Sequence, residues 1–79
     1  MAEAEIGDYV VQAYAWYVPD AGKWQPILCM RRLRGTPERP LSQTFNYCPA
    51  LFETEADAIR YGLTKGRALV KGDIMGLTI

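Results

Sequence analysis

The chain turns from an extended apolar segment into a helix within the stretch Phe52-Glu53-Thr54-Glu55-Ala56-Asp57-Ala58. Thr54 is a favoured N-cap residue, and Asp57 occupies the N3 position of a weaker variant of the capping box. Beyond this start, small and apolar residues recur at helical spacing, and Gly72 is placed to end the helix. The sequence therefore predicts a helix over residues 55–71 that packs on the extended structure before it.

Upstream of the helix, β-branched and aromatic residues predict three strands, over residues 9–18, 23–34 and 42–48. Pro19-Asp20-Ala21-Gly22 is a turn sequence between the first two strands, because Pro presets φ and Gly accepts a positive φ. The predicted fold class is α+β, a three-stranded antiparallel sheet packed by one helix. Residues 74–79 are predicted to form a short fourth strand or a tail that docks its apolar side chains.

The composition is that of one small globular domain. The chain has 79 residues, 49% of them hydrophobic and 23% charged, which is near the lower size limit for a single core. Residues 1–7 are predicted to be a loosely ordered acidic lead, and residues 8–79 a single α+β domain. Nine basic and nine acidic side chains cancel, so the chain has no net field that would steer it to nucleic acid or anionic lipid.

Several kinds of chemistry are disfavoured by what the chain lacks. Without His and with only two Cys, it cannot build the usual zinc site, and a Cys nucleophile would have no His as its base. We therefore expect no catalytic residue, metal or cofactor. The N-terminus has no signal-peptide pattern and no apolar run reaches spanning length, so a cytoplasmic location without membrane contact is predicted. There, Cys29 and Cys48 would be reduced, and we interpret them as small buried hydrophobes in preference to a redox pair.

A cluster of arginines lies at the end of the second predicted strand and in the loop just beyond it, and it is the candidate nucleic-acid site. Arg side chains offer forked donors that suit phosphate, and neighbouring aromatic rings could stack on bases. The alternative is a solvated face whose arginines pair with the acidic residues of the chain. The candidate residues for nucleic-acid binding are Trp24, Arg31, Arg32, Arg34 and Arg39.

The first predicted strand is apolar on both faces, so only one face can lie beneath the single helix. We assign Tyr14, Trp16 and Val18 to the core under the helix. Gly62 and Gly66 on the inner stripe of the helix each cost about 1 kcal/mol of helix propensity, which close approach to such bulky rings explains. The opposite face would then pack on a second copy of the chain, through Tyr9, Val11 and Tyr17.

Some of these features resemble known DNA-binding domains. The string Gly22-Lys23-Trp24, then Phe45, and the helix entry Phe52-x-Thr54-Glu55-Ala56-x-Ala58 resemble the three-stranded-sheet domains of the AP2 and phage-integrase arm-binding type. That resemblance implies a sheet that enters the major groove, with Trp24, Arg32 and Arg34 as reading residues. The chain departs from the pattern because it is not basic. It also resembles small uncharacterised bacterial proteins of β-β-β-α layout, and this second resemblance implies no function.

The sequence thus predicts a small, cytosolic, non-enzymatic binding module. Its predicted ligand is nucleic acid, bound through the Arg and aromatic face of the sheet. The alternative is a protein-interaction or homodimeric module that binds no nucleic acid and uses the same aromatic residues as interface.

Overall fold

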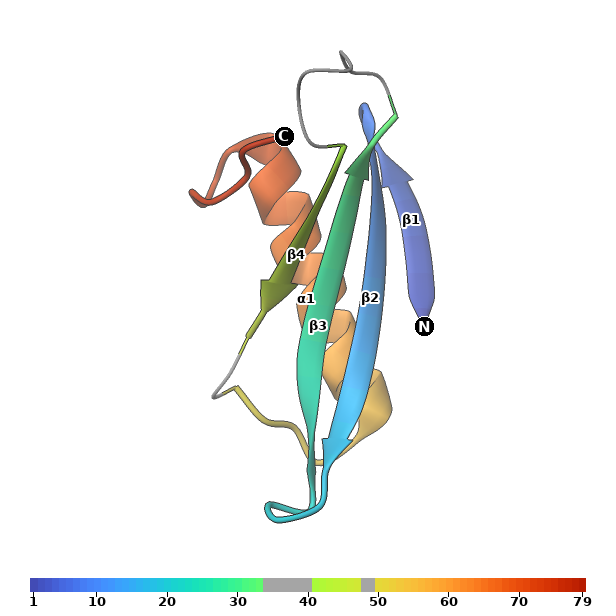
Figure 1. Cartoon of the computed structure of the whole chain (residues 1–79), viewed down its shortest axis with the longest axis vertical. Coiled ribbons are helices and arrows are strands. Elements are labelled where there is room, and N and C mark those ends of the chain that lie inside the picture. Colours follow the sequence, from blue (N-terminus) through green and yellow to red (C-terminus); the bar gives the residue numbers. More distant parts are fainter. Residues whose placement is uncertain (34–40, 48–49) are drawn as a thin grey trace.

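The computed structural model describes residues 1–33, 41–47 and 50–79 and shows an α+β fold, with one helix packed on an antiparallel four-stranded sheet (Figure 1). The strands lie in chain order, β1-β2-β3-β4, so that each pairs with its sequence neighbour. This arrangement confirms the predicted fold class and adds one strand to it. The elements are β1 Ala2–Ile6, β2 Tyr9–Val18, β3 Lys23–Arg32, β4 Ser42–Asn46 and α1 Glu55–Lys71.

The predicted helix is confirmed, and its ends are formed by the residues expected to form them. The Thr54 hydroxyl oxygen accepts a hydrogen bond from the backbone N–H of Asp57 at 3.1 Å. At the other end, Gly72 adopts a φ of 79°, and its N–H donates to the carbonyl of Leu69 at 3.3 Å. Local sequence therefore fixes both ends of α1 independently of the sheet.

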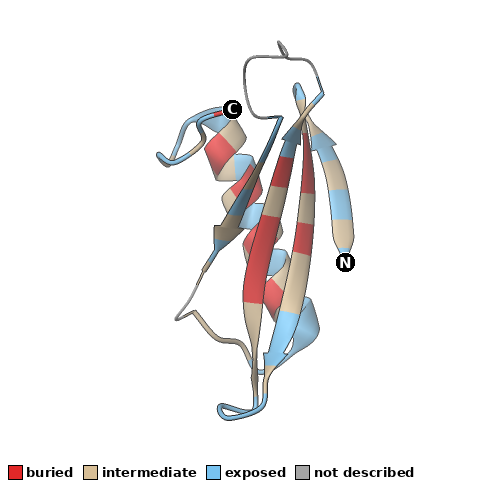
Figure 2. Ribbon diagram, in the orientation of Figure 1, coloured by how far each residue is buried: buried red, intermediate tan, exposed pale blue. Residues whose placement is uncertain are grey.

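α1 lies very close to the sheet. A Cβ atom added at Gly66 would stand 2.5 Å from Cγ1 of Val11, and one added at Gly62 would stand 3.2 Å from Cβ of Ala13. The two glycines thus allow the helix backbone to approach β2 directly. The core that results lies between the helix and the central strands, where Figure 2 shows the buried residues. Its buried cluster consists of Val11, Leu28, Met30, Leu69 and Ile79.

The prediction of a loosely ordered acidic lead over residues 1–7 is wrong for Ala2–Ile6, which form the edge strand β1. Gly7, at a φ of 58°, makes the tight turn that lets Ile6 pair with Tyr9 of β2. The alternation of Ala with Glu places the small side chains of β1 towards the helix and its two carboxylates on the opposite face. This is the period-2 pattern of a half-buried strand.

The C-terminal segment, residues 74–79, docks without forming a strand, which confirms the docked alternative. Ile79 is only 8% exposed and belongs to the core cluster. The side-chain amide of Gln43 on β4 holds the segment, since it donates to the carbonyl of Gly76 at 2.8 Å and accepts from the N–H of Thr78 at 2.9 Å. The fourth strand of the sheet is therefore at the N-terminus of the chain.

The helix covers the face of β2 opposite to the one that the sequence analysis predicted. Val11 and Ala13 of β2 lie against the helix glycines. Because successive side chains of a strand point to opposite faces, Tyr14, Trp16 and Val18 point away from α1. The interpretation that placed these three residues in the core beneath the helix is therefore wrong.

Candidate functional site

The face of the sheet opposite α1 is the surface towards the viewer in Figure 1, and we call it the open face. Among the described residues, α1 is the only helix, and it packs on the other side. The residues of the open face follow from the strand register. They are Glu3 and Glu5 of β1; Val10, Gln12, Tyr14, Trp16 and Val18 of β2; Lys23, Gln25, Ile27, Cys29 and Arg31 of β3; and Ser42, Thr44 and Asn46 of β4.

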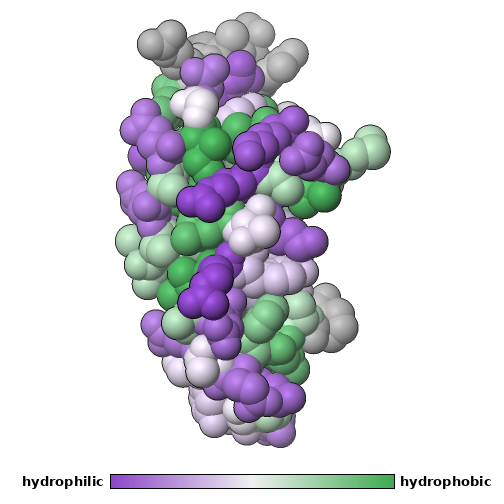
Figure 3. Space-filling view, turned by 180° about the vertical axis from the view of Figure 1, so that it is seen from behind, coloured by the Kyte–Doolittle hydropathy of each residue, from purple (hydrophilic) through white to green (hydrophobic). Residues whose placement is uncertain are grey.

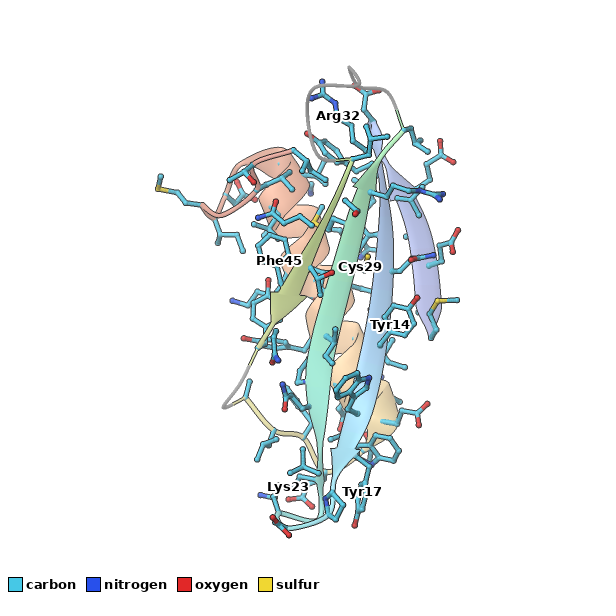
Figure 4. The ribbon with its side chains drawn as sticks, viewed as in Figure 1. Tyr14, Tyr17, Lys23, Cys29, Arg32 and Phe45 are labelled. Atoms are coloured by element: carbon cyan, nitrogen blue, oxygen red, sulfur yellow. The ribbon has the colours of Figure 1, made fainter. Side chains whose placement is uncertain are left out.

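Apolar side chains run along the centre of the open face. Tyr14 on β2 pairs directly with Ile27 on β3, and the neighbouring rows contribute Trp16 and the half-buried thiol Cys29. Tyr14 and Cys29 come from adjacent central strands in Figure 4. Trp16 is 65% exposed, whereas Val10, at the other end of the same strand, is 6% exposed. The stripe thus combines apolar side chains with Gln12 and Gln25, and its most accessible apolar member is the indole ring of Trp16, whereas Ile27 is only 9% exposed.

Polar and charged side chains border this stripe on both sides. On the β1 side, the Gln12 amide donates to a Glu3 carboxylate oxygen at 3.0 Å. On the β4 side, the Gln25 amide donates to the side-chain oxygen of Asn46. Arg31 is exposed at one end of the face. The open face therefore has an apolar centre, an acidic edge at β1 and an uncharged hydrogen-bonding edge at β4.

The nucleic-acid candidates do not share one exposed face. Arg31 lies on the open face, whereas Trp24 and Arg32 lie on the helix-side face together with Leu28 and Met30, both fully buried. The Nε atom of Arg32 is itself buried and has no hydrogen-bond partner among the described residues. Successive strand residues alternate between faces, so adjacent arginines are separated. Arg34 and Arg39 lie outside the described residues.

The residues predicted to form a dimer interface also lie on the helix-side face. Val11 is fully buried beneath α1, so it cannot contact a second copy in this fold. Tyr9, at one end of the same strand face, donates its hydroxyl hydrogen to the carbonyl of Ile79 at 2.8 Å. Tyr17, at the other end, packs its ring edge on Trp24 with 5.3 Å between ring centroids. Tyr9, Val11 and Tyr17 therefore lie on the face that α1 covers, and the buried Val11 has no surface to offer to a second copy.

An aromatic cluster on the helix side borders an open surface depression. Tyr61 of α1 contacts Phe52 and Tyr47, with ring centroids 5.1 and 5.5 Å apart, and the Lys65 ammonium lies 5.3 Å from the Tyr61 ring centre. Burial and then the nearby Tyr61 raise the pKa of Tyr47 above its ordinary value, so its hydroxyl stays protonated at neutral pH. The cluster anchors the segment before α1 to the helix.

The depression beside this cluster is open and has a volume of about 390 Å³. Its two charged residues, Asp57 and Arg60, form an ion pair with each other at 3.2 Å. The rest of the lining consists of Phe52, Tyr61 and Thr64, so the depression has a partly aromatic wall. Figure 3, seen from this side, shows hydrophilic residues spread between hydrophobic patches.

In the part of the chain that the structure describes, no three His, Cys, Asp or Glu side chains lie close enough together to hold a metal ion. No helix there has the length and apolar character needed to cross a membrane. Of the two cysteines predicted to be small buried hydrophobes, Cys29 is half-buried and Cys48 lies outside the described residues. Cys29 pairs with Thr44 of β4 on the open face.

Comparison with known proteins gives no family for this chain: no family model matches it, and neither a curated protein nor a solved structure is significantly similar to it.

Proposed function

We propose that the chain is a small, non-enzymatic binding module that recognises another protein through the open face of its sheet. One observation carries this proposal. The single described helix covers one face, and the other presents an apolar stripe in which Trp16, 65% exposed, lies towards one end of β2. Exposed apolar patches bordered by polar groups are typical of protein interfaces, and Trp and Tyr are the residues most often found at their energetic centres.

The composition of the open face supports a protein ligand over nucleic acid. Two carboxylates, Glu3 and Glu5, stand at its β1 edge, and they would repel phosphates brought to Arg31. Of the two arginines that the resemblance assigned to base reading, Arg32 is on the helix side with a buried Nε atom, and Arg34 lies outside the described residues. An apolar centre with a mixed polar rim is the usual anatomy of a protein–protein contact.

Selection of displayed peptides on immobilised protein tests this proposal. A random 12-residue peptide library should yield binders whose affinity falls at least tenfold with Trp16→Ser, since that change removes the exposed ring of the stripe. Met75→Ser is the matched control, because Met75 is 98% exposed but lies in the C-terminal segment away from the open face, and it should leave binding unchanged.

A fluorescent single-stranded oligonucleotide, tested in parallel, addresses the other class of ligand. We expect no binding at low salt. Oligonucleotide binding that weakens steeply with added salt would overturn the proposal in favour of nucleic acid, because released counterions give that dependence. Peptides that bind equally well to Trp16→Ser would overturn it as well, since their site would lie elsewhere.

A further inference from the structure

We propose that the protein recognised by the open face is a second copy of this chain, with the two sheets face to face and the two-fold axis parallel to the strands. This inference rests on the proposed function and adds the identity and orientation of the partner. A self-complementary surface is what a two-fold dimer requires, because each patch must match itself after rotation. Three properties of the open face meet that requirement.

The first property is the order of residues in the rows that cross the sheet. The strand register sets acidic residues at one edge and hydroxyl or amide residues at the other, with one apolar and one polar or charged residue between them in each of these rows. From the β1 edge to the β4 edge, two rows read Glu5, Val10, Arg31, Ser42 and Glu3, Gln12, Cys29, Thr44. The face is therefore electrostatically asymmetric from edge to edge, and this asymmetry distinguishes the two ways of stacking a copy on it.

A two-fold axis across the strands would place β1 of each subunit over β1 of the other. With the axis at the level of Ala4, Glu3 and Glu5 would then lie over the same two carboxylates of the partner subunit, and like charges brought together at an interface oppose association. An axis parallel to the strands instead places β1 over β4 of the partner and β2 over its β3. The two carboxylates then face Ser42, Thr44 and Asn46, whose hydroxyl and amide groups can donate hydrogen bonds to them.

The second property is the position of Arg31. In its own chain, Val10 of β2 separates Arg31 from Glu5, which puts two strand spacings, roughly 10 Å, between their backbones. In the parallel-axis dimer, Arg31 lies opposite Val10 of the partner subunit, and Glu5 of the partner subunit is one strand spacing to the side, across the roughly 10 Å between the stacked sheets. The two side chains then project towards each other, whereas within one chain they point the same way. The long guanidinium side chain can bridge that offset, and symmetry forms the ion pair twice. Within the described residues, the two ion pairs of the monomer, Lys23–Glu53 and Arg60–Asp57, leave Arg31 and Glu5 for this contact.

The third property is the apolar area near the axis. The same superposition places Tyr14 over Ile27 of the partner subunit and Trp16 over Gln25 of the partner subunit, so the exposed indole becomes buried. From strand spacing and rise, the open face covers roughly 500 Å² in projection. Two such faces bury on the order of 1,000 Å², which is the area at which specific association becomes feasible.

Charge exchange between two variants tests the dimer and its orientation together. Glu5→Arg alone sets Arg against Arg at both cross-subunit contacts, and Arg31→Glu alone sets Glu against Glu. A mixture of the two variants can form a heterodimer in which both contacts again join opposite charges. We expect each variant alone to dimerise at least tenfold more weakly than the wild type in sedimentation velocity. We expect the equimolar mixture to recover the wild-type affinity.

Arg67→Glu is the control, since it reverses an exposed charge on α1 and should not change dimerisation. The inference is overturned if the wild type stays monomeric at millimolar concentration, or if both single variants dimerise as the wild type does. A monomeric wild type that still binds peptides through Trp16 would overturn the second copy as partner and leave the proposed function standing. Loss of both behaviours would overturn both proposals.

Discussion

Gly66→Ala is expected to destabilise the fold by about 2 kcal/mol, although alanine favours a helix by about 1 kcal/mol over glycine. The added Cβ atom would stand 2.5 Å from Cγ1 of Val11 and 3.4 Å from Cδ1 of Leu28. Val11 is fully buried and β-branched, so its methyl groups cannot rotate away without strain. Overpacking of this kind costs about 1–3 kcal/mol, and such a short contact belongs at the upper end. Urea unfolding followed by circular dichroism measures the change.

A second variant tests whether the expected loss of stability in Gly66→Ala comes from the steric contact with Val11. Val11→Ala removes the two methyl groups that the new Cβ would meet, so Gly66→Ala should cost much less in a Val11→Ala background than in the wild type. Gly62→Ala provides a milder comparison, because its nearest neighbour, Cβ of Ala13, would be 3.2 Å away. A Gly66→Ala variant more stable than the wild type would show that the helix does not approach β2 this closely.

Leu28→Ala is expected to cost about 3–4 kcal/mol, the largest effect of any single truncation considered, since buried Leu→Ala changes cost about 2–5 kcal/mol. Leu28 is fully buried on the central strand β3, where it pairs with Ala13 on one side and Phe45 on the other. The helix lies above it, so no neighbour can fill the cavity without moving the helix or a strand. For a domain of this size, such a loss removes much of the total stability.

The control for Leu28→Ala is Leu33→Ala, because Leu33 is 45% exposed just beyond the end of β3. Thermal unfolding of the two variants should differ clearly, with Leu33→Ala close to the wild type. Equal shifts in melting temperature for the two variants would contradict the core described here. They would mean that Leu28 is not buried between β3 and α1.

The helix could be predicted from sequence because its determinants are local. Thr54 caps the start and Gly72 adopts the left-handed conformation that ends it, and neither depends on the sheet. The edge strand β1 was missed because its evidence is weak in local terms. Alanine and glutamate have low strand propensity, and the alternation over Ala2–Ile6 is stabilised by pairing with β2 and by cover from the helix.

The choice of face could not be made from strand periodicity, because both faces of β2 are apolar. What decides it is size. A helix that carries Gly62 and Gly66 on its inner stripe can approach the sheet only over small side chains, and β2 offers Ala13 on that side. The bulky rings of Tyr14 and Trp16 on the other side would hold the helix away. The sequence shows small residues on both elements, Gly62 and Gly66 on the helix and Ala13 on β2. Pairing these small residues places α1 on the Ala13 side of β2 and leaves the large rings on the other face.

The position of the open face, and the partner proposed for it, therefore both depend on which face of β2 the helix packs against. The position of the helix also decides which candidate arginine is exposed. Arg31 and Arg32 are adjacent in sequence, so their side chains lie on opposite faces of β3. Strand alternation alone predicts that they cannot form one cluster. Which of them is exposed depends on where the helix lies, and that depends on the glycines.

The most direct test of the central claim, that the open face is exposed in the monomer and covered by a second copy, is fluorescence quenching of Trp16. In a Trp24→Phe variant, Trp16 is the sole indole of the chain. Because Trp16 is 65% exposed in one chain, acrylamide should quench its emission strongly in dilute protein. Quenching should fall several-fold as the protein concentration rises into the dimeric range. A quenching constant that stays the same from micromolar to millimolar protein would contradict the claim.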